Sequence, residues 1–185
     1  MTTSLCQLKE DMALLQRETK SQVAQLKTEV DKLKTEVDKL KQQLIVRQVA
    51  FSASLVVADP TTIGPFPIDT TLIYKHVATN IGNAYNSKTG MFTAPVRGVY
   101  NFEWSIGAYG DGSHGSAGWL VKNSENVFMA WEKQTSGFMS SSKAVALLLE
   151  VGDVMCVRLV ANGSNVAYDD GSHHTTFSGH LLFPM

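Results

Sequence analysis

The strictest pattern in this chain is the alternation of apolar and polar residues from Tyr100 to Ile106. Successive side chains of a β-strand point to opposite faces, so this period predicts a strand with one face in a core and the other toward solvent. Pro95 precedes the alternation and belongs at a strand end because it lacks a backbone donor, and Gly98 permits a bend. The stretch 90–102 therefore predicts two strands joined by a rigid corner. The predicted core face consists of Tyr100, Phe102, Trp104 and Ile106.

Short strand-like runs separated by turn residues fill the rest of residues 49–185. So many short strands in one segment predict an all-β, two-sheet sandwich. Residues 61–71 are expected to form a loop, and Asn162-Gly163 is a hairpin turn signal. The other predicted strands are 50–57, 72–75, 84–85, 119–122, 127–131, 140–150, 154–160, 166–168 and 175–183.

Residues 5–45 carry a heptad repeat of apolar residues, cleanest in the identical segments 26–32 and 33–39. Valine at a and leucine at d predict an α-helical coiled coil, and glutamate at g with lysine at e favours parallel strands. Valine and leucine at these positions lean toward two strands, but they also permit three. The predicted oligomerisation residues are Val23, Leu26, Val30, Leu33, Val37, Leu40 and Leu44.

The two cysteines, Cys6 and Cys156, are too few for a disulfide framework. Cys156 lies in an apolar alternation and is expected to be a buried free thiol. On a parallel helix Cys6 would meet its own copies, so an interchain disulfide in an oxidising compartment and a free thiol both remain open.

The charge is balanced, with 16 Lys and Arg against 17 Asp and Glu. No part of the chain is basic enough to indicate a nucleic-acid partner. No apolar run approaches the roughly 18 residues of a membrane-spanning helix, so no membrane insertion is expected. The N-terminus lacks the charged-then-apolar pattern of a signal peptide, so this chain does not itself show secretion.

The corner stretch also resembles the signature of the globular head of complement C1q and its relatives. Its motif is Phe-Thr-Ala-Pro-Val at 92–96 followed by Gly-x-Tyr-x-Phe at 98–102. Further matching motifs occur in the family's order at 50–53, 80–85, 147–154 and 177–182. Asn101 and His180 occupy positions where relatives often carry an aromatic residue.

The resemblance implies a ten-stranded, C1q- and tumour-necrosis-factor-like jelly roll. The expected fold class is therefore an all-β jelly-roll sandwich at 49–185, preceded by an N-terminal α-helical coiled coil at 5–45. Because heads of this family assemble as trimers, a homotrimer is predicted over the dimer, with further assembly through Cys6 left open. The coiled coil replaces a collagen-like stalk, since the chain has no Gly-x-y repeat.

The resemblance further implies a secreted, extracellular recognition protein of the innate-immunity, lectin-like kind. It would bind microbial surfaces, glycans or other repeated ligands through its head loops. The alternative is a receptor-binding signalling ligand, like the synaptic-organiser or hormone-like members of the family. Asn162 begins the chain's single Asn-x-Ser acceptor triplet, which makes it a glycosylation candidate and the protein a candidate glycoprotein.

Two loops carry the candidate ligand-binding residues. Residues 110–115 fit the dinucleotide pattern G-x-G-x-x-G, but no helix follows, so a binding loop is expected instead. Residues 169–174 group acidic and imidazole side chains in one turn. The candidate ligand-binding residues are Asp111, His114, Asp169, Asp170 and His173.

No metal or cofactor is predicted for either loop. Calcium is left open because some relatives bind it in their heads, but no calcium motif matches residue by residue. Zinc needs more than two neighbouring histidines. No nucleophile, base and orienting group can be placed together in the sequence, so the protein is predicted not to be an enzyme.

Overall fold

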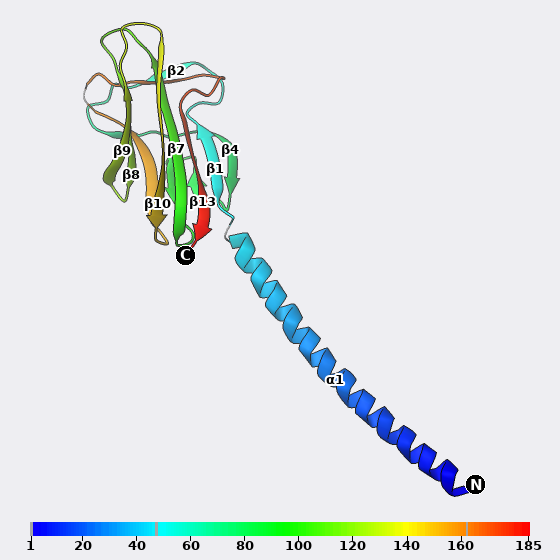
Figure 1. Ribbon diagram of the computed structural model, residues 1–185. Coiled ribbons are helices and arrows are strands. Elements are labelled where there is room, and N and C mark those ends of the chain that lie inside the picture. Colours follow the sequence, from blue (N-terminus) through cyan, green and yellow to red (C-terminus); the bar gives the residue numbers. More distant parts are fainter. Residues whose placement is uncertain (1, 47, 162) are drawn as a thin grey trace. The chain divides into compact units, whose positions relative to one another are not determined.

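The computed structural model describes residues 2–46, 48–161 and 163–185, and within the helix the side chains of residues 7–42 and 44 (Figure 1). The chain divides into two compact units, Met1–Leu44 and Ile45–Met185, here named the stalk and the head.

The stalk is formed by one long helix, α1 (Thr2–Val46), which confirms the helix predicted from the heptads. Neither Gly nor Pro interrupts it. The a and d side chains from Val23 to Leu44 are 46% to 61% exposed in the single chain. A regular apolar stripe of this kind is the seam that a coiled coil buries. Among the described residues, no helix is both long and apolar enough to span a membrane.

The head is a sandwich of two antiparallel sheets, and the chain crosses between them several times. The first sheet contains, in spatial order, β10 (Phe138–Leu149), β7 (Gly98–Tyr109), β13 (Thr176–Pro184), β1 (Ala50–Ser54) and β4 (His76–Ile81). The second contains β5 (Tyr85–Asn86), β6 (Met91–Thr93), β11 (Val154–Leu159), β8 (Ser116–Lys122) and β9 (Glu125–Glu132). These two five-stranded paths confirm the predicted ten-stranded jelly roll.

Three short strands supplement this framework. β3 (Thr70–Thr71) pairs with β11 at the second sheet. β2 (Thr61–Ile63) and β12 (Ala167–Asp169) form a separate two-stranded ribbon.

The core lies between the sheets and is built on the inner face of β7. Tyr100, Phe102, Trp104 and Ile106 are at most 1% exposed, as the alternation predicts. Burying each of these side chains contributes about 1.5–3 kcal/mol to folding. The Trp104 indole donates a hydrogen bond to the Gly118 carbonyl at 3.1 Å, so its buried N–H is satisfied.

Gly98 has a different role from the predicted bend. A Cβ at this position would lie 2.6 Å from the Phe183 carbonyl oxygen on the neighbouring strand. Glycine is therefore required because β7 and β13 approach closely here. Gly179 serves the core in the same way, since a Cβ there would lie 2.6 Å from the Phe102 ring.

The predicted strand at 72–75 is wrong. Strands β3 and β4 flank this segment, and β2 and β3 lie inside the predicted loop 61–71. Leu72 and Tyr74 are buried while Ile73 is 37% exposed, so the alternation that suggested a strand is present. The segment crosses from the second sheet to the first. Its alternation reflects which side chains are buried, and it does not mark a strand that pairs with a neighbour.

The predicted hairpin at Asn162-Gly163 is also wrong, and Asn162 itself lies outside the described residues. In the described residues β11 pairs with β3, β6 and β8, whereas β12 pairs with β2. Cys156 is the predicted buried free thiol, and burial raises the pKa of this thiol. The side chain of Cys6 lies outside the described residues.

Candidate functional site

Three loops meet at the end of the sandwich where β7 ends and β8 begins; residues 110–115, 133–137 and 163–166 are here named the loop face. Gly110 N–H donates to the Gly137 carbonyl at 2.7 Å, and Gly112 N–H donates to the Gln134 carbonyl at 3.2 Å. Gly115 N–H donates to the Ser164 carbonyl at 2.8 Å. These backbone bonds hold the three loops together as one surface on a rigid scaffold.

Asp111 organises the first of these loops. Its Oδ1 accepts hydrogen bonds from the backbone N–H groups of Ser113 at 2.8 Å and His114 at 2.7 Å. Its Oδ2 lies 2.6 Å from Nδ1 of His114. The His114 backbone donor, the His114 ring and the Ser113 donor, in that order, lower the pKa of Asp111 to about 2. Because this pKa is depressed, the ordering effect of the carboxylate is present above its usual pKa and is lost as the pH falls toward 2.

A cleft of about 360 Å³ opens beside this pair and is here named the loop cleft. Exposed Tyr109, at the end of β7, lines it together with Asp111 and His114. The remaining lining residues are Thr62, Gly64, Pro65, Gly110 and Val166.

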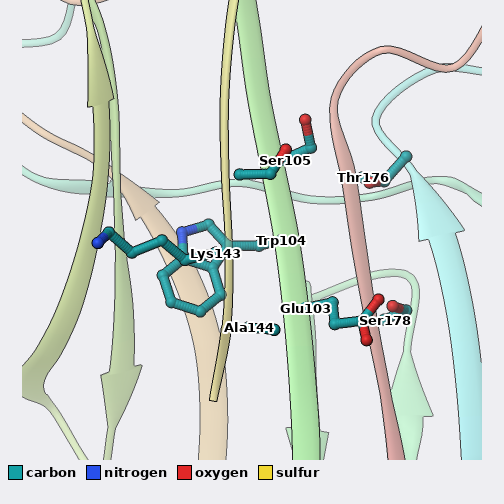
Figure 2. A pocket seen from close by; sticks show the side chains of 8 residues that line it. Glu103, Trp104, Ser105, Lys143, Ala144, Thr176 and Ser178 are labelled. Carbon is teal, nitrogen blue, oxygen red and sulfur yellow. The ribbon is translucent and has the colours of Figure 1, made fainter.

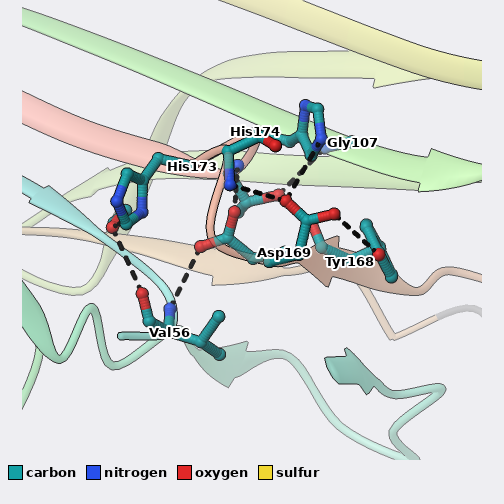
Figure 3. A network of polar contacts seen from close by, with 10 residues as sticks. Val56, Gly107, Tyr168, Asp169, His173 and His174 are labelled. Carbon is teal, nitrogen blue, oxygen red and sulfur yellow. Dashed lines mark hydrogen bonds and ion pairs between the residues drawn. The ribbon is translucent and has the colours of Figure 1, made fainter. Parts of the chain in front are cut away.

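Asp169 occupies a different environment, since it is fully buried. One carboxylate oxygen accepts a hydrogen bond from Val56 N–H at 3.0 Å, and the other accepts one from Thr175 N–H at 3.2 Å (Figure 3). The side chain thus ties the end of β12 to the segment after β1. Both carboxylate oxygens serve the scaffold.

Replacing Asp169 with alanine is expected to destabilise the head by several kcal/mol. The change leaves one buried and one partly buried backbone donor unpaired, and a buried unpaired donor costs about 1–3 kcal/mol. Asp169→Asn keeps one acceptor oxygen, so its stability should lie between those of wild type and Asp169→Ala. Urea unfolding of the three proteins tests this, and equal midpoints for Asp169→Ala and wild type would contradict the scaffold role.

His173 also belongs to the scaffold. Its Nδ1 lies 2.7 Å from the Ser54 hydroxyl, which is 3.1 Å from Nδ1 of His76. The two imidazole rings stack with centroids 4.4 Å apart and an interplanar angle of 5°. His173 has a φ of 60°, a left-handed conformation that places its ring against the end of β1.

Asp170 instead faces an aromatic group beside the loop face. It accepts a hydrogen bond from the Tyr168 hydroxyl at 2.9 Å and lies 3.4 Å from Nε2 of His174. The bond to Asp170 is the main cause that raises the pKa of Tyr168 to about 12. The pKa of Asp170 is lowered, chiefly by the N–H of Ser172.

The structure therefore divides the five candidate residues into two sets. Asp111 and His114 lie at the loop cleft, and Asp170 is connected to them through Tyr168 and Tyr109, whose ring centroids are 4.9 Å apart. Asp169 and His173 lie in the scaffold behind. Sequence reasoning missed Tyr109, although its place after inward-facing Ala108 marks it as an outward aromatic at a strand end.

Within residues 2–46, 48–161 and 163–185, no three His, Cys, Asp or Glu side chains are grouped so that they could hold a metal ion.

The strand order of the two sheets defines a jelly-roll sandwich. The family model described as the C1q domain matches residues 50–182, so the chain belongs to the C1q-domain family.

The individual relatives agree with this placement. Mouse complement C1q tumor necrosis factor-related protein 3 is 34% identical over 137 residues, which is 74% of this chain and 52% of that protein. The chain thus spans about half the length of that curated relative.

Two solved structures share the fold. The globular domain of zebrafish complement 1qA superposes with a TM-score of 0.59 at 18% identity, over 74% of this chain and 99% of that one. The tumour necrosis factor Eiger from S. frugiperda superposes with a TM-score of 0.60 at 15% identity, over 75% and 95% of the two chains.

Proposed function

We propose that this protein is a secreted, non-enzymatic homotrimer that binds glycans of microbial surfaces through the loop cleft of each head. The observation that carries the proposal is the joint presence of exposed Tyr109 and the Asp111–His114 pair in one open cleft. Membership of the C1q-domain family supports an extracellular recognition role.

The chemistry of the loop cleft suits a sugar. A carboxylate offers about four lone-pair sites, and three hydrogen bonds occupy those of Asp111 in this structure. One acceptor site remains for a ligand hydroxyl, and Nε2 of His114 offers another polar contact. The exposed Tyr109 ring supplies a flat apolar surface for the C–H face of a sugar ring. The cleft volume, about 360 Å³, lies at the lower end of the roughly 300–1,000 Å³ typical of ligand pockets.

Two surfaces support the proposed trimer. The first is the apolar seam of α1. The second is the outer face of the first sheet, where Ser105, Ala144 and Ser178 stand on β7, β10 and β13 around Glu103 (Figure 2). These side chains and their neighbours surround a shallow hollow of about 340 Å³. Small side chains allow a second copy to approach the sheet closely.

Three heads on one stalk convert weak single contacts into tight attachment to a repeated surface, because the second and third contacts are intramolecular. Asn162 as a glycan acceptor and Cys6 as a joint between trimers belong to the same proposal. Glycosidase treatment and reduction, each followed by mass measurement, test them separately.

The double variant Tyr109→Ala, Asp111→Asn is expected to lose at least tenfold in apparent affinity for immobilised bacterial polysaccharides. The change removes both the stacking surface and the charged acceptor from the loop cleft. Glu125→Gln is the matched control, because Glu125 follows the β8–β9 turn at the opposite end of the sandwich and is exposed. Binding should be measured on surfaces coated with polysaccharide, with free sugar as competitor, and repeated with a chelator, which we expect to change nothing.

The second candidate function is that of a receptor-binding signalling ligand. The observation that favours it is the 34% identity to a protein named as tumor necrosis factor-related. Saturable binding to one membrane protein, unaffected by free sugars and by the double variant, would support this alternative and contradict the glycan proposal.

A further inference from the structure

A second hollow, distinct from the loop cleft, opens at the side of the head and has a volume of about 330 Å³. Every residue that lines it comes from the segment 55–75, which leaves β1 and returns to β4. The segment is closed on itself by the Lys75 N–H, which donates to the Leu55 carbonyl at 3.3 Å. The hollow is here named the side pocket.

The walls of the side pocket are mainly apolar. Leu55 is 3% exposed and belongs to the core, and Val56, Ile63 and Phe66 pack against that core. Ile73, which is 37% exposed, lies toward the solvent side. An exposed apolar hollow bordered by polar residues is a typical place for a ligand to bind.

The polar groups of the side pocket define what that occupant carries. Lys75 is exposed and is the single charged residue among those that line the pocket. In the described part of the chain, no carboxylate forms an ion pair with it. The threonine hydroxyls at positions 61 and 70 already donate to backbone carbonyls. An exposed lysine that lines an apolar hollow and forms no ion pair complements a molecule with an apolar tail and an anionic head.

We propose that the side pocket binds a free medium-chain fatty acid, with its acyl chain against Leu55, Ile63 and Phe66 and its carboxylate at Lys75. The pocket of about 330 Å³ has room for on the order of ten methylene-sized groups, at roughly 30 Å³ for each water-sized unit. Burial of the chain supplies most of the affinity, and Lys75 selects the anion. This site shares no residue with the loop cleft, so it does not depend on the proposed glycan function.

Calorimetric titration of the full chain with decanoate tests the proposal. We expect saturable binding that weakens about tenfold in Lys75→Met, which keeps the length of the side chain and removes its charge. The neutral analogue 1-decanol should bind wild type and Lys75→Met equally. Lys88→Met, at an exposed lysine on the β5–β6 turn, should bind decanoate as wild type does.

A second variant tests the apolar part. Ile73→Glu places a carboxylate at the partly exposed rim and should abolish decanoate binding while leaving the melting temperature of the head within a few degrees of wild type. The proposal is overturned if decanoate does not saturate the protein, or if neither variant changes its affinity. Attachment to anionic phospholipid vesicles without any binding of free decanoate would overturn it too, because a membrane surface would then be the partner.

Discussion

Replacing Leu33 and Leu40 together with alanine is expected to abolish the cooperative helical melting of the stalk. In the single chain the side chain of Leu33 is 60% exposed and that of Leu40 is 58% exposed. Once copies of the chain close the seam, these side chains become core residues, and truncation of a core leucine costs about 2–5 kcal/mol. With two leucines in each of three chains, the loss amounts to about 12–30 kcal/mol for each proposed trimer.

The sign of the effect distinguishes a seam from a solitary helix. Alanine is at least as good a helix former as leucine, so in an isolated helix the same double variant would leave helicity unchanged or raise it. Far-UV circular dichroism during heating measures the helicity, and light scattering measures the mass of the assembly. Unchanged melting and unchanged mass would show that this stripe is not the seam.

Thr28→Ala with Thr35→Ala is the matched control. Both threonines lie on the opposite face of the heptad, and their hydroxyls donate to the carbonyls of Ala24 and Asp31 within the helix. Alanine improves helix propensity at both positions, so the control should melt at the same temperature as wild type or slightly above it.

Replacing Phe177 with alanine is expected to cost the head about 3–5 kcal/mol, which is a large part of the total stability of an ordinary domain. Phe177 is fully buried on β13. Its ring centroid lies 4.8 Å from that of Phe51, 5.7 Å from that of Tyr74 and 6.1 Å from that of Phe102. Phe177 thus joins side chains of β1 and β7, the two strands beside β13, and of the crossing segment 72–75. Chemical denaturation followed by tryptophan fluorescence measures the change.

Phe177→Leu keeps most of the volume and should cost clearly less, whereas Phe128→Ala removes a ring that is 43% exposed on β9 and should have a small effect. Equal losses for Phe177→Ala and Phe128→Ala would contradict the position of Phe177 at the centre of the core.

The sequence predicted those parts of the fold in which apolar residues recur at a regular spacing. The alternation on β7 identified the core face from Tyr100 to Ile106, and the heptads identified α1. In both elements, burial follows directly from the spacing of apolar residues along one regular backbone.

Pairing partners are not encoded in such a period. The segment 72–75 alternates between buried and exposed residues but crosses between the sheets, and β12 pairs with β2, about a hundred residues earlier, rather than with its neighbour β11. A local pattern states which side chains are buried, whereas the choice of partner depends on contacts distant in sequence.

The candidate site shows the same division. Composition directed attention to the loops 110–115 and 169–174 but could not separate the exposed Asp111 from the buried Asp169, because both are aspartates in turns. Only the fold shows that Val56 and Thr175 occupy both carboxylate oxygens of Asp169.

Strand β2 has a hollow on each of its two faces, since Thr62 lines the loop cleft while Thr61 and Ile63 line the side pocket. This three-residue strand thus separates the loop cleft from the side pocket. If a ligand in one hollow displaces this strand and so changes the affinity of the other hollow, equilibrium linkage requires an equal effect in the opposite direction. A substitution at Thr62 therefore changes the lining of the loop cleft, and one at Thr61 or Ile63 changes that of the side pocket, although the three residues are neighbours on one strand.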